Sequence, residues 1–138
     1  MTVNPSSCVV TDTVQQAARL MKSEDIGPIP IISDLERRKL EGIITDRDIV
    51  LKVVAEGRDP QTTRLGDVMT RQVFTCRIDD DADKALELMQ EHQVRRIPIV
   101  NDHGQLVGIV SQADIATRLE EPRKTGEVVK EISKAANI

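Results

Sequence analysis

Apolar and polar positions follow a clear order along the first half of the chain. Residues 14–21 carry apolar side chains at three- and four-residue spacing, which predicts an amphipathic helix. Short apolar runs at residues 8–10, 29–32 and 40–44 predict strands, and the charged segment between the last two predicts a hairpin turn. A second helix is expected to begin near Asp48. The first half therefore predicts a βαββα unit.

The second half of the chain has the same pattern. Apolar runs at residues 73–78, 97–100 and 106–110 predict strands, and residues 82–89 predict an amphipathic helix. A second helix is expected to begin near Asp114. The chain therefore predicts two βαββα units in tandem.

Aligning the two halves shows that they are a sequence repeat. Cys8 coincides with Cys76 at a shift of 68 residues, and Asp48 coincides with Asp114 at a shift of 66, because the second hairpin turn is shorter. So many ordered matches with a single gap are not expected by chance. The coinciding residues also include Met1 and Thr2 with Met69 and Thr70, Asp12 with Asp80, Ala17 with Ala85, Ile29 to Ile31 with Ile97 to Ile99, Leu40 with Leu106, and Gly42 and Ile43 with Gly108 and Ile109.

The fold class that follows is mixed α/β (α+β), with tandem βαββα repeats related by a pseudo-twofold axis. Neither repeat is expected to bury both faces of its sheet alone, so the two are expected to share one core. Pro30 and Pro98 predict an edge position or a strand start for the apolar runs that contain them. The predicted divisions are residues 1–56 (first repeat), 57–68 (linker and lead-in), 69–120 (second repeat) and 121–138 (a C-terminal helical tail).

The start of the chain differs from the start of the second repeat. The first repeat has no lead-in, because the chain begins at the equivalent of Met69. This indicates either a short natural start or a trimmed one.

Composition excludes several function classes. The formal net charge is −4, so there is no basic excess to neutralise a nucleic-acid backbone. Phe74 is the only aromatic residue, so the chain lacks the rings on which single-stranded bases stack. No apolar run approaches the length of a membrane span, and the first residues do not form a signal peptide. We predict a cytoplasmic protein that binds neither nucleic acid nor membrane.

The cysteines and histidines do not suggest catalysis or a metal. Cys8 and Cys76 are too few for a disulfide framework, and their spacing to His92 and His103 fits no zinc site. We expect both cysteines to be reduced, buried strand residues. No nucleophile–base arrangement and no glycine-rich phosphate loop is present, so an enzyme is not predicted and no cofactor or metal is expected.

The repeated strand–helix junction is the strongest candidate for a binding site. Its sequence is GIITDRDI at residues 42–49 and GIVSQADI at residues 108–115. The hydroxyl residue and the acid three positions later fit a capping box, in which they only satisfy the backbone at a helix start. The same geometry also fits ligand binding, because a carboxylate at a helix start can accept hydrogen bonds from both hydroxyls of a ribose.

The duplicated pattern over residues 1–119 resembles the CBS motif pair, or Bateman module. Small bacterial proteins made only of this pair are similar, and some are linked to stress responses. The resemblance implies a non-enzymatic sensor that binds AMP, ADP, ATP or S-adenosyl compounds between the two motifs. A homodimer of two modules in a flat disk is expected, because the repeated helices carry more aliphatic residues than one module should need, and the resemblance supports it. An unidentified protein partner is possible as well.

The resemblance assigns roles to residues of both repeats. Asp48 and Asp114 match the acids that bind ribose, and each ligand is expected to lie between the repeats. Asp114 would act with Thr13, Ile26 and Gly27, and Asp48 with Val94 and the loop at residues 79–81. The remaining matches are Thr45 and Ser111 beside ribose or phosphate, Ile43 and Ile109 flanking adenine, and Ile26 and Val94 contacting the base.

Phosphate contacts are expected to differ between the repeats. Arg95 and Arg96 stand where some family members have phosphate-binding basic residues, while the first repeat has Gly27 and Pro28 there. Arg47 is a third candidate, and a solvated helix end is the alternative role for all three arginines.

Two other interpretations stay open at this point. The first alternative is a dimerisation module with empty clefts. The second is a regulatory part of a larger enzyme or transporter with no ligand of its own.

Overall fold

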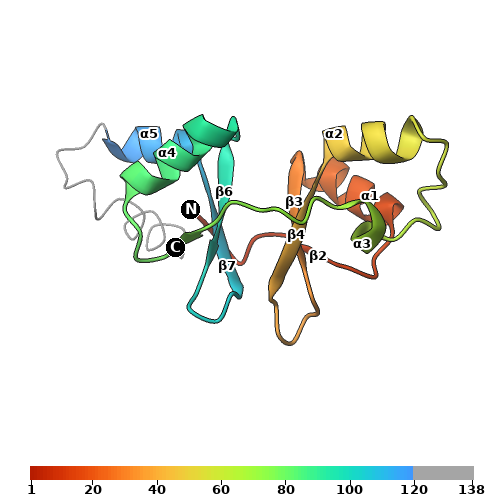
Figure 1. Ribbon diagram of the computed structural model, residues 1–138, viewed down its shortest axis with the longest axis horizontal. Coiled ribbons are helices and arrows are strands. Elements are labelled where there is room, and N and C mark those ends of the chain that lie inside the picture. The colour runs from red at the N-terminus through yellow and green to blue at the C-terminus, as the bar shows by residue number, and fades with distance from the viewer. Residues whose placement is uncertain (120–138) are drawn as a thin grey trace. The chain divides into compact units, whose positions relative to one another are not determined.

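The computed structural model describes residues 1–119, which form two compact units (Figure 1). The first-repeat unit is Ser6–Val73, and the second-repeat unit combines Met1–Pro5 with residues 74–119. The predicted helical tail over residues 121–138 lies outside the described residues. Within residues 1–119, no helix is long and apolar enough to cross a membrane.

The first-repeat unit contains the βαββα elements that the sequence predicts. In its three-stranded sheet, β2 pairs parallel with β3 and β3 pairs antiparallel with β4. In chain order the elements are β2 (Cys8–Val9), α1 (Val14–Glu24), β3 (Pro28–Ile32), β4 (Leu40–Thr45), α2 (Asp46–Ile49), the π-helical segment η1 (Val50–Val54) and α3 (Leu65–Val68).

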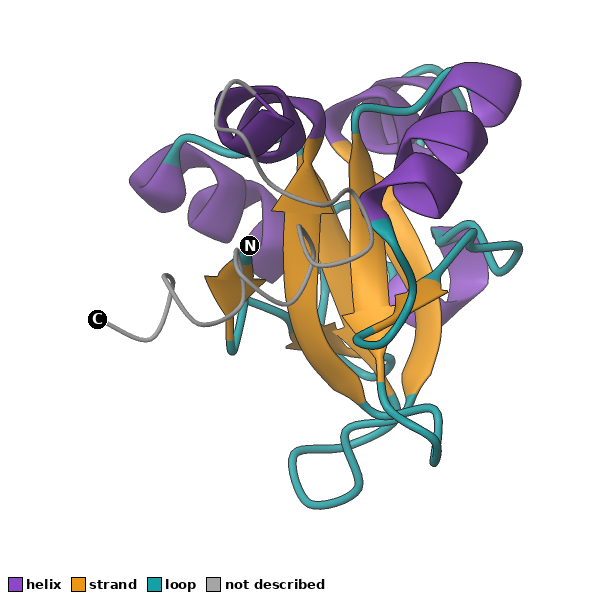
Figure 2. Ribbon diagram, turned by 90° about the vertical axis from the view of Figure 1, so that its left-hand side faces the viewer, coloured by secondary structure: helices purple, strands orange, loops and turns teal. Residues whose placement is uncertain are grey.

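The second-repeat unit has the same order with one added strand. Its sheet runs β1-β7-β6-β5, with β1 supplied by the N-terminus. The elements are β1 (Thr2–Val3), β5 (Cys76–Arg77), α4 (Ala82–His92), β6 (Arg96–Val100), β7 (Leu106–Ser111) and α5 (Gln112–Leu119). Helices α2 and α5 start where β4 and β7 end, on the side of each hairpin opposite to its loop (Figure 2). The predicted duplication and fold class are confirmed.

The long helix of each repeat begins and ends in the same way. Thr13 caps α1 by accepting a hydrogen bond from the Gln16 backbone amide, and Asp81 caps α4 through the Lys84 amide. Both helices end at a left-handed residue, Asp25 in α1 and Gln93 in α4. This turn brings the chain back to start β3 and β6.

Buried hydrophobic residues pack within each unit, and the core expected to be shared between the repeats stays a prediction. Buried residues form two clusters, one within each unit. In the first-repeat unit, helix residues such as Val14 and Ala17 pack on strand residues such as Ile29 and Ile31. Each sheet therefore buries a face against the helices of its own unit, which is why a separate cluster forms in each.

The first residues of each repeat pair with the sheet of the other repeat. Thr70 forms two backbone hydrogen bonds with Ile43 of β4, at 2.8 and 2.9 Å. In the same way Thr2 of β1 pairs with Ile109 of β7. This exchange explains why Met1–Pro5 belongs to the second-repeat unit.

Pro30 and Pro98 are not at an edge of the sheet or at a strand start, so the prediction made for these two prolines is wrong. Pro30 is the third residue of β3, the middle strand, and Pro98 has the same place in β6. Pro30 lies opposite Ile43, whose amide and carbonyl both bond to Thr70 instead. The β2 pairing starts only at Ile31, so the missing N–H of proline leaves no ladder bond unmade.

Candidate functional site

Both repeated junctions form capping boxes at the start of a helix. At β4–α2, the Asp48 amide donates to Thr45 Oγ1 at 3.0 Å, and the Thr45 amide donates to Asp48 Oδ2 at 3.0 Å. At β7–α5, Ser111 and Asp114 exchange equivalent bonds of 3.1 and 3.0 Å. The capping hydrogen bonds expected from the motif are thus present, and they occupy one carboxylate oxygen of each acid.

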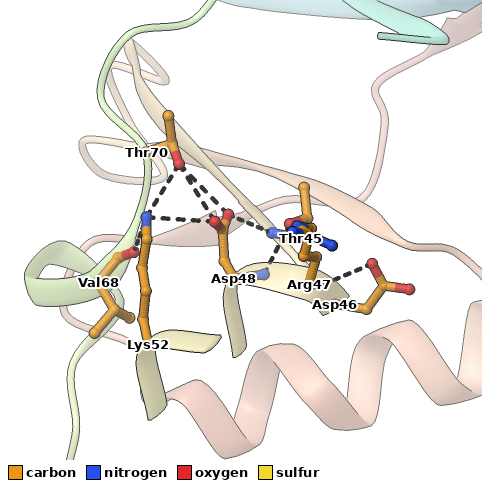
Figure 3. Close-up of polar contacts among 7 residues, drawn as sticks. All are labelled: Thr45, Asp46, Arg47, Asp48, Lys52, Val68 and Thr70. Atoms are coloured by element: carbon orange, nitrogen blue, oxygen red, sulfur yellow. Dashed lines mark hydrogen bonds and ion pairs between the residues drawn. The ribbon is translucent and has the colours of Figure 1, made fainter. Parts of the chain in front are cut away.

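The second oxygen of Asp48 is held by groups of its own unit (Figure 3). Lys52 Nζ lies 3.3 Å from Asp48 Oδ1 and also donates to the Val68 carbonyl oxygen and to Thr70 Oγ1. The Thr70 hydroxyl lies 3.5 Å from both oxygens of Asp48, at the outer limit of a hydrogen bond. Only 16% of the Asp48 side chain is exposed.

Asp114 is more open than Asp48. Its side chain is 40% exposed, and the Met1 amino group lies 3.8 Å from Oδ2, beyond hydrogen-bond distance. Its Oδ2 atom accepts a hydrogen bond from the Ser111 amide. The repeat thus places two equivalent acids in two different environments.

The segments that precede β3 and β6 lie against these junctions. The Asp46 amide donates to the Gly27 carbonyl at 3.1 Å, and the Gln112 amide donates to the Arg95 carbonyl at 2.8 Å. Ile26 and Gly27 therefore lie next to the junction that contains Thr45 and Asp48. All four are candidate binding residues, and all four belong to the first-repeat unit. Val94 and Arg95 lie in the same way beside Ser111 and Asp114.

A cavity of about 510 Å³ opens beside the second junction. Val94 and Arg95 line it together with Gln112 at the start of α5. The other lining residues come from α4 and its C-cap and are Leu86, Met89, Gln90 and Gln93. The lining combines three apolar side chains with three glutamines and one guanidinium, a mixture that suits a small polar ligand carrying negative charge.

The other predicted residues have separate surroundings. The Thr13 hydroxyl is used as the α1 cap, and Arg96 is exposed at the start of β6 opposite Ser111. Arg47 is exposed as well, and its amide donates to Asp46 Oδ1. Ile43 and Ile109 lie on β4 and β7, and Ile109 is buried at 8% exposure. The pairing of Asp114 with Thr13, Ile26 and Gly27, and of Asp48 with Val94, joins residues of different units and stays a prediction.

Four residues beside the junctions were not predicted. These residues are Asp46, Lys52, Thr70 and Gln112. Lys52 stands four positions after Asp48 on a helix, a spacing that favours an ion pair and was readable in the sequence. The contact of Thr70 with Asp48 depends on the exchanged lead segment, which no local pattern reveals.

Cys8 and Cys76 are buried free thiols, as predicted. They occupy equivalent places, Cys8 opposite Ile31 and Cys76 opposite Ile99. Burial raises the pKa of each thiol to about 11, and the neighbouring carboxylates of Asp12 and Asp80 act in the same direction. Within residues 1–119, no group of three His, Cys, Asp or Glu side chains gathers closely enough to hold a metal ion.

Comparison with known proteins gives a consistent family. A family profile for the CBS domain matches residues 1–55 and 65–121. Hypoxic response protein 1 of Mycobacterium tuberculosis is 43% identical over 110 residues, which cover 80% of this chain and 75% of that protein.

Solved structures agree with the sequence comparison. The crystal structure of Hypoxic Response Protein I with two coordinated zinc ions superposes with a TM-score of 0.76, at 39% identity over 86% of this chain and 94% of that one. The CBS domain pair of protein MJ0100, in complex with 5′-methylthioadenosine and S-adenosyl-L-methionine, has a TM-score of 0.69 and 30% identity, covering 85% of this chain and 90% of that one.

Proposed function

The chain belongs to the CBS-domain family as a pair of CBS motifs, and from this premise we propose that it is a regulatory sensor of an adenine-containing ligand. The ligand classes proposed are AMP, ADP, ATP and S-adenosyl compounds. We further propose that the protein acts in the cytoplasm without catalysing a reaction, because its site offers hydrogen bonds and charge but no nucleophile.

The observation that carries the proposal is the open carboxylate of Asp114. It stands at the start of α5 with 40% of its side chain exposed, although Ser111 already satisfies the capping role. A carboxylate oxygen that remains accessible beside a helix start can accept the hydroxyls of a ribose. Each charge-assisted hydrogen bond of this kind contributes roughly 1.5–3 kcal/mol.

A cavity near the second junction offers groups that suit the other parts of an adenine nucleotide, although Asp114 is not among its lining residues. Val94 offers an apolar surface for a base, and Arg95 offers a guanidinium for phosphate, both on the wall of the cavity of about 510 Å³. The MJ0100 relative is a complex with two adenosine derivatives. Its ligands support adenine compounds as the first class to test on this chain.

The deciding experiment is calorimetry with AMP, ADP, ATP and S-adenosylmethionine on three proteins. Wild type is expected to bind at least one of them, and Asp114→Ala to bind it about tenfold more weakly or worse. Asp114→Asn is the matched control, because its amide oxygen can still accept from Ser111 while the charge is lost. We expect Asp114→Asn to melt like wild type but to bind as weakly as Asp114→Ala. If none of the four compounds binds wild type, the proposed function is wrong.

A second candidate function, dimerisation without a ligand, is favoured by one apolar surface. Val50, Leu51 and Val54 of η1 are 54%, 47% and 66% exposed. Adjacent exposed aliphatic residues on one helix are typical of protein–protein interfaces. We propose that this surface pairs with a second copy of the chain, which is compatible with ligand sensing and does not require it.

A further inference from the structure

The two ribose-binding candidates differ most in what already surrounds them. Asp48 and Asp114 occupy equivalent positions of the repeat, and both use one oxygen in a capping box. What differs is the exposure of the side chain, which is 16% for Asp48 and 40% for Asp114.

Lys52 pairs with Asp48 and helps to make its side chain inaccessible. Its ammonium group carries three hydrogens, and three acceptors surround it: Asp48 Oδ1 at 3.3 Å, the Val68 carbonyl at 3.2 Å and Thr70 Oγ1 at 3.3 Å. Figure 3 shows the ammonium group between these acceptors. The donor capacity of Lys52 is therefore fully used inside its own unit.

The acceptor capacity of Asp48 is nearly used as well. A carboxylate offers about four lone-pair sites. The Thr45 amide and the Lys52 ammonium take two, and the Thr70 hydroxyl at 3.5 Å faces both oxygens. A ribose that uses two hydroxyls would have to displace Lys52 or Thr70.

The backbone holds this arrangement in place. Thr70 is fixed by its two hydrogen bonds to Ile43, so its hydroxyl stays beside Asp48. Lys52 lies on η1, a π-helical segment, whereas the corresponding part of the second repeat continues as the regular helix α5. Short π-helical segments frequently occur at functional sites. The two junctions thus differ in their backbone and in the exposure of their acids.

We propose that Lys52 occupies the ribose-binding face of Asp48, so that each chain binds one adenine ligand, through Asp114. This inference rests on the proposed function. Lys52 acts here as an internal cation in place of ligand hydroxyls, and it determines how many ligands a chain takes.

The test measures ligand stoichiometry by calorimetry, using whichever of AMP, ADP, ATP and S-adenosylmethionine binds wild type most tightly. Wild type is expected to bind about one ligand per chain. Asp48→Ala should keep the affinity within about twofold, while Asp114→Ala weakens it about tenfold or more. Lys52→Met should raise the stoichiometry to about two, and the added site should disappear in Lys52→Met/Asp48→Ala.

A matched control is Lys84→Met, which removes another lysine that pairs with an acid four positions earlier, Asp80, at 3.1 Å. It should bind like wild type. Two ligands per wild-type chain, an unchanged stoichiometry in Lys52→Met, or weaker binding by that variant would each overturn the inference while leaving the proposed function intact. Absence of binding in every protein would overturn both. Should Lys52→Met fail to fold, the comparison of Asp48→Ala with Asp114→Ala still decides which acid holds the ligand.

Discussion

Gly42 lies against Met69 so closely that a Cβ atom on Gly42 would stand 2.8 Å from the Met69 sulfur. The Thr70 carbonyl oxygen would be even nearer, at 2.7 Å. Gly108 has the same relation to Met1, whose sulfur would lie 2.5 Å from the added atom. The glycine of the repeated motif thus makes room for the lead segment of the other repeat.

We expect Gly42→Ala to lower the free energy of unfolding by about 1–3 kcal/mol, the usual cost of overpacking. The methionine side chain can move, but the Thr70 carbonyl belongs to the backbone bridge with Ile43 and cannot move without breaking it. Chemical denaturation of wild type and variant measures the difference.

Gly27→Ala is the matched control for that measurement. The nearest atoms to its added Cβ would be carboxylate atoms of Asp46 at 3.5 Å, an ordinary van der Waals distance. Its stability should stay within about 0.5 kcal/mol of wild type or rise slightly. Equal losses in both alanine variants would contradict the packing role of Gly42.

The sequence predicted those parts of the fold that depend on local periodicity. The repeat of Cys8 at Cys76 and the apolar spacing over α1 and α4 identified both units. The capping boxes at Thr45 and Ser111 were equally predictable, because a hydroxyl and an acid three positions apart suffice to define them.

The remaining features depend on contacts between distant segments. Nothing near Ile43 in the sequence indicates that Thr70 will satisfy its backbone, so the interior position of Pro30 was not predicted. The same bridge brings Thr70 to Asp48. Because Thr2 pairs with Ile109 in the same way, this pairing does not by itself explain the difference in exposure between Asp48 and Asp114. The site could be located from the sequence, but its asymmetry could not.

The free energy of unfolding should fall as the pH rises through the alkaline range in which thiols titrate. Burial raises the pKa of Cys8 and Cys76 to about 11 in the folded chain, so the unfolded chain releases these protons first. The stabilisation is complete below the unfolded pKa of roughly 8.5 and is lost progressively up to about 11. Denaturation at several pH values across this window measures the slope.

The double variant Cys8→Ala/Cys76→Ala is the reference for the slope, because it keeps the titrating lysines. It should lose less stability with rising pH than wild type does. Native wild type should also react slowly with a thiol reagent at neutral pH, since both side chains are buried. Rapid labelling before unfolding would count against buried, protonated thiols.

Self-association should depend on the apolar surface of η1. A charge at Val54, which is 66% exposed, would have to be desolvated in any interface formed by that helix. We expect wild type to behave as a dimer in light scattering at micromolar concentration, and Val54→Asp to shift toward monomer. Leu35→Asp changes an aliphatic side chain that is 77% exposed on the hairpin and should have no effect. A monomeric wild type would exclude the homodimer.

Phosphate-bearing ligands should depend on Arg95 and Arg96 more than adenosine does. Arg95 lines the cavity beside Asp114, and both side chains are exposed enough to meet a phosphate without a large desolvation cost. Because exposed charge pairs are screened, we expect the double variant Arg95→Ala/Arg96→Ala to bind AMP or ATP about three- to tenfold more weakly than wild type does. Adenosine binding should change by less than about twofold.

Two controls separate phosphate contact from a general effect of charge. Arg58→Ala removes an exposed arginine outside the junctions and should leave AMP or ATP affinity unchanged. Raising the salt concentration should weaken the binding of AMP or ATP to wild type more than the binding of adenosine. This difference should shrink in Arg95→Ala/Arg96→Ala, because salt screens the charges that the variant has lost. Equal losses for nucleotide and adenosine would instead mean that the arginines support the structure of the junction and do not touch the phosphate.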